Sequence, residues 1–361
     1  MLLGPLYKKF FALLRYSLGI DESFAHRLSA EEWSWVRGEA DRQALVGVLY
    51  MGIKKLPEDL RPPRLLLMQW AFDVENIRGT NQKVNEVAAT FTRLFKERGR
   101  ESVILKGPAN ALLYPDSFAR SCGDVDIMLP GGRDSVVKLL AEMGLMDGAD
   151  VGAHHAHLND DLFGIAVEVH YVPTEGANSP SKNRLVQNFL ASEFANSTLA
   201  PVGFCVPSVK YALVMQLAHV KEHFFGVGIG LRQLVDYYML LKYSSAEDRE
   251  TVSAMLRNFG LWRMAQAVMW LLHECLGLGE EFLLCKPDEW RGKRLMNVAL
   301  VGGNFGFHDV NFAGPQPYRW YKHYKRAAYL LRFDFTEALW HELWALTGVP
   351  RRVLKSLCGQ A

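Results

Sequence analysis

Two aspartates separated by one residue are the most informative side chains of the sequence. Asp124 and Asp126 lie in the segment 123–129 (GDVDIML), where polar and apolar residues alternate as in a half-buried strand. This alternation places both carboxylates on one face, with their Cα atoms about 6.5–7 Å apart. Because neighbouring carboxylates repel each other, a bound divalent cation is the natural counter-charge. The alternative is that both acids lie on the solvated face of a sheet.

A third acid follows the same pattern on a later strand. The segment 165–171 (IAVEVHY) alternates again and places Glu168 and His170 on one face. With Asp124 and Asp126, Glu168 would form a cluster that holds two Mg²⁺ ions, or Mn²⁺ in their place, and two such ions can activate an attacking oxygen and stabilise a leaving phosphate oxygen. These three acids are the predicted catalytic residues and metal ligands. His170 either orients the acceptor or a carboxylate, or makes a structural hydrogen bond.

The residues before the aspartates have the pattern of an anion-binding turn. A short apolar run at 102–105 ends in Lys106-Gly107, and 108–113 (PANALL) predicts a helix with proline at its first position. Free N–H groups at a helix start favour phosphate, Gly107 permits close approach of the backbone, and Lys106 adds positive charge. We therefore predict a phosphate site at this turn, formed by Lys106, Gly107, Ala109 and Asn110.

Together these motifs resemble a known family. The string ILKGPANALLYPDSFARSCGDVDIMLP, followed by VEVHY, LAHVKEHFFGVGIGLRQLVDYYMLL and GGNFGF, is similar to an uncharacterised bacterial nucleotidyltransferase family of the DNA polymerase β superfamily. The resemblance is strong over 103–130 and 165–243 and weak at the ends of the chain. It implies the same phosphate turn and the same three acids as functional residues.

The resemblance also implies roles for further polar residues. Arg120 matches an arginine of the family motif and would hold a phosphate; a structural ion pair with the acids is the alternative. His219, His223, Arg232 and Asp236 match positions in the family's C-terminal helices, from which they would contact nucleotide or acceptor. The alternative is an interhelical polar network, because Arg232 and Asp236 are four residues apart and can pair along one helix.

Two groups of histidines suggest metal chemistry of another kind. His219-Val-Lys-Glu222-His223 fits the H-x-x-E-H pattern of a zinc peptidase, with two histidine ligands on one helix face and Glu222 as general base. We keep this function as a remote alternative, because a five-residue pattern is common by chance. The segment 154–157 (HHAH) shows no matching ligand set and is expected to lie in an exposed loop.

The elements that position these residues divide the chain into three regions. We predict an N-terminal helical region at 1–99, a nucleotidyltransferase core at 100–175 and a C-terminal helical region at 176–361. The fold class is therefore α/β (α+β), a minimal core with a mixed sheet flanked by helices. Ser29 and Glu32 form a potential capping box at one helix start. Apolar spacing predicts helical segments at 31–56, 64–99, 133–143, 207–224, 230–243, 247–278 and 319–346.

Composition limits the function further. The 361 residues contain 41 Lys+Arg and 39 Asp+Glu, and this balance gives no overall field that would attract nucleic acid. The five cysteines form no CxxC pair, which fits a reducing compartment. No run of about 18 apolar residues is present, and the first twenty residues predict an amphipathic helix. We expect a cytoplasmic enzyme without a membrane span.

Basic and aromatic residues interleave at 318–355. Such a stretch can hold an RNA strand or another phosphorylated acceptor. We favour the alternative, an amphipathic helix with its arginines on the solvated face. Nucleic acid is therefore a partner that we do not favour.

The predicted reaction is transfer of a nucleoside monophosphate from an NTP to an acceptor hydroxyl, with release of pyrophosphate. The acceptor is a small molecule, a peptide or protein, or RNA, and the sequence leaves both it and the oligomeric state open. Two alternatives remain. One is transfer of another phosphate-linked group, such as a sugar phosphate, onto a natural-product peptide; the other is a catalytically silent nucleotide-binding protein.

Overall fold

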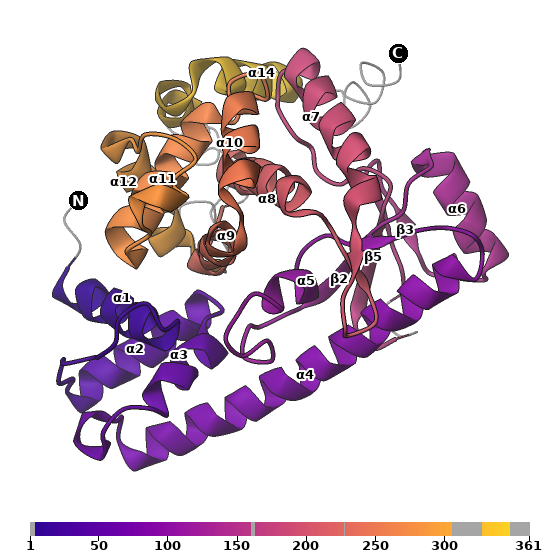
Figure 1. Cartoon of the computed structure of the whole chain (residues 1–361). Coiled ribbons are helices and arrows are strands. Elements are labelled where there is room, and N and C mark those ends of the chain that lie inside the picture. The colour runs from indigo at the N-terminus through magenta and orange to yellow at the C-terminus, as the bar shows by residue number, and fades with distance from the viewer. Residues whose placement is uncertain (1–3, 160–162, 227, 305–326, 347–361) are drawn as a thin grey trace.

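The computed structural model describes residues 4–159, 163–226, 228–304 and 327–346 (Figure 1). These residues form helices around a five-stranded mixed sheet, and a separate two-stranded hairpin joins β6 (Thr198–Leu199) to β7 (Cys205–Val206). The predicted α/β class, with helices flanking a mixed sheet, is confirmed. The division into three regions stays a prediction.

The N-terminal helices begin where local sequence signals place them. α1 (Pro5–Ser17) has proline at its first position, and α2 (Ala30–Arg42) has the predicted capping box. The Ser29 Oγ accepts a hydrogen bond from the Glu32 N–H at 3.2 Å, and the Glu32 carboxylate accepts one from the Ser29 N–H at 3.0 Å. Two orphan donors of the helix start are thereby satisfied.

The predicted segment 31–56 is two helices, so its description as one segment is wrong. α2 ends at Arg42, and α3 (Val46–Ile53) starts four residues later. Between them Ala44 has a φ of 54°, and the Leu45 N–H donates to the Ala40 carbonyl at 2.8 Å. This left-handed turn closes the first helix. Apolar residues keep a helix-like spacing across this turn, so the sequence pattern did not show that the segment is two helices.

One long helix joins the two hydrophobic cores. α4 (Arg64–Lys96), which was predicted, runs from the N-terminal helices to the sheet (Figure 1). In its first half Trp70 and Val74 belong to a core shared by the N-terminal and C-terminal helices. In its second half Phe91 and Phe95 belong to the core beneath the sheet. The sheet is thereby fixed relative to the helical part of the protein.

The sheet has the strand order β1-β2-β5-β4-β3. Its central strands, β2 and β5, are parallel, and every other neighbouring pair is antiparallel. The register of the central pair places Asp126 opposite Glu168. The strands predicted at 123–129 and 165–171 are confirmed, and the apolar run at 102–105 contains a third strand. The strand bounds are β1 (Val103–Ile104), β2 (Asp124–Met128), β3 (Asp150–Val151), β4 (His155–His157) and β5 (Ala166–His170).

The histidine-rich segment is a strand, so the expectation of an exposed loop was wrong. In β4, His155 lies opposite His170 and His157 lies opposite Glu168 of the antiparallel β5. Ala156, between the two histidines, is fully buried in the core beneath the sheet. Polar and apolar residues therefore alternate in β4 as in any half-buried strand, but β4 has only three residues.

The two faces of the sheet have different chemistry. Val125 and Ile127 pack in the core formed with α4 and with α6 (Gly132–Glu142), which was predicted. The opposite face carries the acids and faces α8 (Val209–Phe225), which lies on the other side of β2 and β5 from α4 (Figure 1). The acids therefore point into the space between the sheet and the C-terminal helices.

The C-terminal region is helical, as predicted, but the segment 247–278 is two helices. α10 and α11 are separated by a turn in which Gly260 has a φ of 67°. Residues 327–333 are helical, whereas residues 318–326 and 347–355 of the basic-aromatic stretch lie outside the described residues. The helix bounds are α7 (Pro180–Glu193), α9 (Leu231–Tyr243), α10 (Ala246–Met255), α11 (Trp262–Leu276), α12 (Glu289–Gly302) and α14 (Phe335–Leu346).

No helix in the described ranges is long and apolar enough to cross a membrane. The first helix, α1, packs Phe10, Leu13 and Leu14 into the core that the helical regions share. The predicted cytoplasmic location stays a prediction.

A buried ion pair attaches the last described helix to α8. The Lys221 Nζ lies 2.7 Å from the Glu337 Oε2, and their side chains are 2% and 0% exposed. The same oxygen accepts a hydrogen bond from the Asn178 N–H at 2.7 Å. Burial opposes ionisation of Glu337, but the Lys221 ammonium outweighs it and holds the pKa of Glu337 below its usual value.

We predict that Glu337→Ala destabilises the protein by about 3–5 kcal/mol, because Lys221 would be left charged and buried without its partner. Urea unfolding at pH 7 measures this. The contribution of Glu337 is fully present above the pKa of an unfolded glutamate, about 4.3, and is lost as the pH falls through its lower folded pKa. The difference between wild type and variant should therefore shrink as the pH falls below about 4.

Asp59→Ala is the matched control, because its partner Arg27 is exposed and surface pairs contribute about 1 kcal/mol or less. Equal unfolding midpoints for Glu337→Ala and Asp59→Ala would contradict the role of the buried pair.

Candidate functional site

Asp126 is the central residue of the site. Its side chain is 0% exposed, and its Oδ1 lies 3.0 Å from the His170 Nε2 and 3.4 Å from the Lys106 Nζ. One partner comes from the end of β1 and the other from β5, the two strands adjacent to β2. Burial opposes ionisation, but the charge of Lys106 and the hydrogen bond from His170 outweigh it and hold the pKa of Asp126 far below its usual value. Asp126 is therefore an ionised, buried carboxylate.

The remaining oxygen of this carboxylate indicates where a cation fits. The Asp126 Oδ2 is buried and has no hydrogen-bond partner among the described residues. Asp124 lies two residues away on the same strand face, and the charge of Asp126, aided by burial, raises the pKa of Asp124. Buried carboxylate oxygens without donors are costly, and a divalent cation would satisfy them. The donor set therefore fits the predicted metal.

Glu168 joins the two aspartates from the neighbouring strand. Its Oε2 lies 3.2 Å from the His170 Nε2, and burial is outweighed by this hydrogen bond, which lowers the pKa of Glu168. Asp124, Glu168 and Lys106 line one pocket of about 260 Å³ between the sheet and α8. The structure thus brings the three predicted acids together: Asp124 and Glu168 line the pocket, and the fully buried Asp126 lies opposite Glu168 on the neighbouring strand.

His170 lies between two of the acids. Its Nε2 is within 3.2 Å of both the Asp126 Oδ1 and the Glu168 Oε2. Burial disfavours the charged imidazole, but these two hydrogen bonds outweigh it and raise the pKa of His170 to about 9. At neutral pH the ring is thus a cation that holds two carboxylates in position. Of the roles that the sequence analysis considered for His170, this geometry fits the orientation of the carboxylates.

His155 is a residue that the sequence analysis did not place in the site. Its ring centroid lies 4.9 Å from that of His170, and its Nε2 lies 3.8 Å from the Glu168 Oε2. The candidate ligand atoms of His155, Glu168 and His170 all lie within 4.8 Å of one another. A protonated imidazole has no free nitrogen lone pair, so the His170 ring that holds the two carboxylates does not itself ligate a metal. The alternation in HHAH was the signal that could have identified this strand residue.

The predicted phosphate turn lies at the edge of the same space. Gly107 has a φ of 60° and precedes α5 (Pro108–Ala111), which has only four residues. A side chain at Gly107 would lie 3.3 Å from the Asp124 carbonyl oxygen, so glycine allows the turn to approach β2 closely. The Ala109 N–H donates to the Lys106 carbonyl at 3.2 Å. Lys106, Gly107 and Asn110 line a small space that adjoins the pocket at Lys106 and Asp124, whereas Ala109 is not among its lining residues.

Asn110 attaches the turn to α8. Its amide exchanges two hydrogen bonds with the amide of Gln216, at 2.7 Å and 3.2 Å, and its side chain is buried. This pair of amides connects the turn to α8. Direct contact of Asn110 with phosphate stays a prediction.

Arg120 and Asp236 form a buried, bidentate ion pair. Their side chains are each 4% exposed, and the two contacts measure 2.8 Å and 2.6 Å. The Tyr114 hydroxyl donates to the same carboxylate at 2.7 Å, and Arg232 donates to the Ser121 carbonyl at 2.9 Å. These contacts attach the loop before β2 to α9. Arg120 therefore pairs with Asp236. The sequence analysis had offered the acids of the site as its structural partners.

His219 and His223 lie on the α8 side of the pocket. Their Nε2 atoms are 3.0 Å apart, and the Lys106 Nζ lies 3.4 Å from the His219 Nε2. Burial, aided by the charge of Lys106, lowers the pKa of His223 to about 4 and that of His219 well below its usual value. Both rings are therefore neutral at pH 7, with hydrogen-bonding capacity toward the pocket.

This arrangement disfavours the zinc peptidase. The Lys106 ammonium lies beside the nitrogen that would have to bind zinc, and like charges repel. The Glu222 carboxylate accepts hydrogen bonds from the Thr174 hydroxyl at 3.3 Å and the Glu175 N–H at 3.2 Å. These hydrogen bonds attach the loop after β5 to α8, so the Glu222 carboxylate is not directed at a metal-bound water as a general base would be.

We predict that Arg120→Met destabilises the protein by about 3–5 kcal/mol, because Asp236 would remain buried without its cation. Urea unfolding measures this loss. Arg133→Met, in an exposed ion pair, is the control and should cost about 1 kcal/mol or less. If Arg120→Met were as stable as wild type and lost only affinity for NTP, Arg120 would be assigned to phosphate binding instead.

A mixed sheet that brings three carboxylates together beside a lysine and a glycine turn has the arrangement of a nucleotidyltransferase. The chain belongs to the family described as uncharacterised nucleotidyltransferase, whose model matches residues 29–277, more than two thirds of its length. No curated protein and no solved structure matches the chain. The predicted family is confirmed, and with it a generic nucleotidyltransferase role; the bacterial origin and the wider superfamily stay predictions.

Proposed function

We propose that the protein transfers a nucleoside monophosphate from an NTP to an acceptor hydroxyl, with divalent cations held by Asp124, Asp126 and Glu168. The observation that carries this proposal is the buried Asp126 Oδ2, which has no partner in the described part of the chain and lies beside a second carboxylate of raised pKa. The family supports the transferase class. The nucleotide, the acceptor and the metal belong to the proposal.

The bond changes follow from this reaction class. The acceptor oxygen bonds to the α-phosphorus while the bond between the α-phosphorus and the bridging oxygen breaks. Pyrophosphate leaves with the electron pair of that bond, and the hydroxyl proton passes to the Glu168 carboxylate. Bound Mg²⁺ or Mn²⁺ would neutralise the phosphates and lower the pKa of the attacking hydroxyl.

Four residues around the acids would bind phosphate or hold the carboxylates in position. Lys106, whose pKa the carboxylates raise against the effect of burial, would neutralise phosphate charge at the turn. Gly107 would let the backbone approach those phosphates. His170 holds Asp126 and Glu168 in position from behind, so that the carboxylates need little reorganisation when a cation binds. The neutral His219 would offer a hydrogen bond on the α8 side.

We predict that Asp124→Asn weakens metal-dependent binding of NTP at least about tenfold, since one charged ligand of a hard cation is lost. Isothermal titration of each NTP with Mg²⁺, and separately with Mn²⁺, measures this. Asp124→Asn should not unfold the protein, because the substitution relieves repulsion with Asp126. Its unfolding temperature should be equal to that of wild type or higher.

Asp150→Asn is the matched control, because this aspartate is exposed on the edge strand β3 and should leave NTP binding unchanged. Unchanged binding in Asp124→Asn would exclude the carboxylate cluster as the nucleotide site. Failure of the folded wild type to bind any NTP with either metal would overturn the proposed function.

A further inference from the structure

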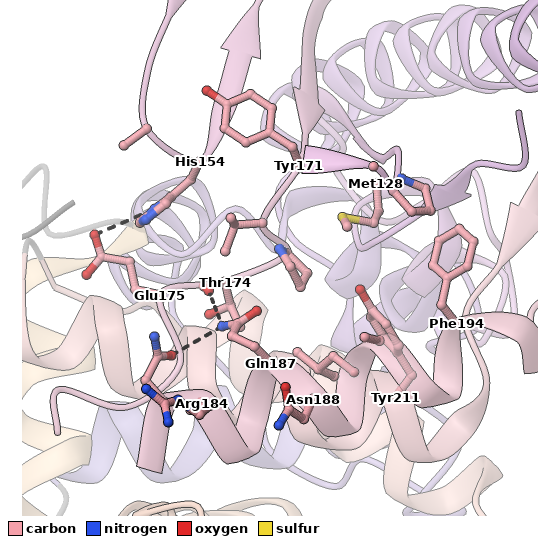
Figure 2. Close-up of a pocket in the computed structure, with 18 residues that line it drawn as sticks. Met128, His154, Tyr171, Thr174, Glu175, Arg184, Gln187, Asn188, Phe194 and Tyr211 are labelled. Atoms are coloured by element: carbon pink, nitrogen blue, oxygen red, sulfur yellow. Dashed lines mark hydrogen bonds and ion pairs between the residues drawn. The ribbon is translucent and has the colours of Figure 1, made fainter. Parts of the chain in front are cut away.

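A second, larger cavity adjoins the catalytic pocket and has no role in the proposed handling of the nucleotide. It measures about 390 Å³ and lies between the ends of β2 and β5, α7 and the start of α8 (Figure 2). Much of its wall is apolar, with Met128, Val172, Leu190 and Phe194 among the lining residues. Pockets of this size and composition hold small organic molecules.

One buried polar atom in this cavity lacks a partner. Tyr211 is 2% exposed, and its hydroxyl makes no hydrogen bond with any residue that the structure describes. Burial raises the pKa of Tyr211, so the hydroxyl is a neutral donor. Figure 2 shows it pointing from α8 into the space between Met128 and Phe194. Buried hydroxyls are rarely left unpaired, which indicates a ligand atom at this place.

The position of the cavity relates it to one side of the reaction. It shares His154, Thr174 and Glu175 with the catalytic pocket that Glu168 lines. It shares no lining residue with the smaller space beside Lys106 and Gly107, among the residues described. The cavity therefore lies beyond the acids on the side away from the phosphate turn.

The charges of the cavity restrict what it can hold. Arg184 and Glu175 are the lining residues with full opposite charges, and Glu175 pairs with His154 at 3.9 Å. A polyanion such as RNA needs several cations along its path. Side-chain amides line one side, where Gln187 donates to the Thr174 carbonyl at 3.0 Å. Apolar walls with a few polar groups suit an uncharged organic molecule.

We propose that this cavity binds the acceptor of the transfer reaction, an uncharged, compact aromatic or largely apolar alcohol with an atom that accepts a hydrogen bond from Tyr211. The assignment rests on the proposed function. The acceptor's reactive hydroxyl would extend past Thr174 and Glu175 into the pocket at Glu168. The acceptor class thereby narrows to a small molecule.

The test uses a library of neutral aromatic alcohols of the size of indole-3-ethanol, screened by saturation-transfer NMR on the full chain with Mg²⁺. Ala153→Trp fills the cavity, and Tyr211→Phe removes its unpaired donor. Tyr237→Phe is the control, because this buried tyrosine lies outside the cavity and donates to the Leu213 carbonyl. NTP binding is measured by titration in all four proteins.

We expect alcohols to bind wild type and Tyr237→Phe alike, to bind Tyr211→Phe at least about fivefold more weakly, and not to bind Ala153→Trp. NTP binding should stay unchanged throughout. Tyr211→Phe should unfold at the same temperature as wild type or higher, because the Tyr211 hydroxyl has no hydrogen bond to a described residue that the substitution would remove. Tyr237→Phe should unfold at a lower temperature.

Three results would overturn the assignment. Equal alcohol binding by Ala153→Trp and wild type would place the alcohol elsewhere. Loss of NTP binding in Ala153→Trp would assign the cavity to the nucleobase while the proposed function stands. Absence of NTP binding by wild type, whatever the alcohols do, would remove the proposed function itself and the acceptor with it.

Discussion

The site depends on the need to neutralise one fully buried carboxylate. Asp126 can be ionised inside the protein because a cation lies on each side of β2, Lys106 in the turn after β1 and His170 in β5. Both cations use one oxygen of the carboxylate, so the other oxygen is left for a further positive charge. The raised pKa of His170 and the fit to a divalent cation both follow from this constraint.

The helices contribute to the site as much as the sheet does. α8 supplies His219 beside Lys106, and α9 holds the loop before β2 through the ion pair of Asp236 with Arg120. α4 crosses from the helical core to the sheet core, so these two parts of the protein cannot separate without exposing apolar surface on one of them. The cleft between sheet and helices is therefore a product of the whole described chain.

Charge varies along this cleft in a way that suits group transfer. One end has Lys106 and a glycine turn that would receive phosphates, and the middle has three carboxylates that would hold cations between two oxygen-rich reactants. The far end has nearly balanced charge, apolar walls and the unpaired hydroxyl of Tyr211. This difference in charge between the two ends would direct a polyanionic donor and an uncharged acceptor to different ends of the cleft without a conformational change.

The sequence by itself determined the features that depend on neighbours along the chain. Period-two alternation gave the two central strands and the shared face of Asp124 and Asp126, and the Ser29 capping box gave a helix start. Only the tertiary structure decided which distant side chains meet. Arg120 and Asp236 are 116 residues apart, and His155 meets His170 only through the pairing of β4 with β5. The Tyr211 hydroxyl has no partner among the described residues only because of how α7 and α8 meet the sheet. Local patterns record which face of an element is buried, but the partners on that face depend on how the elements pack.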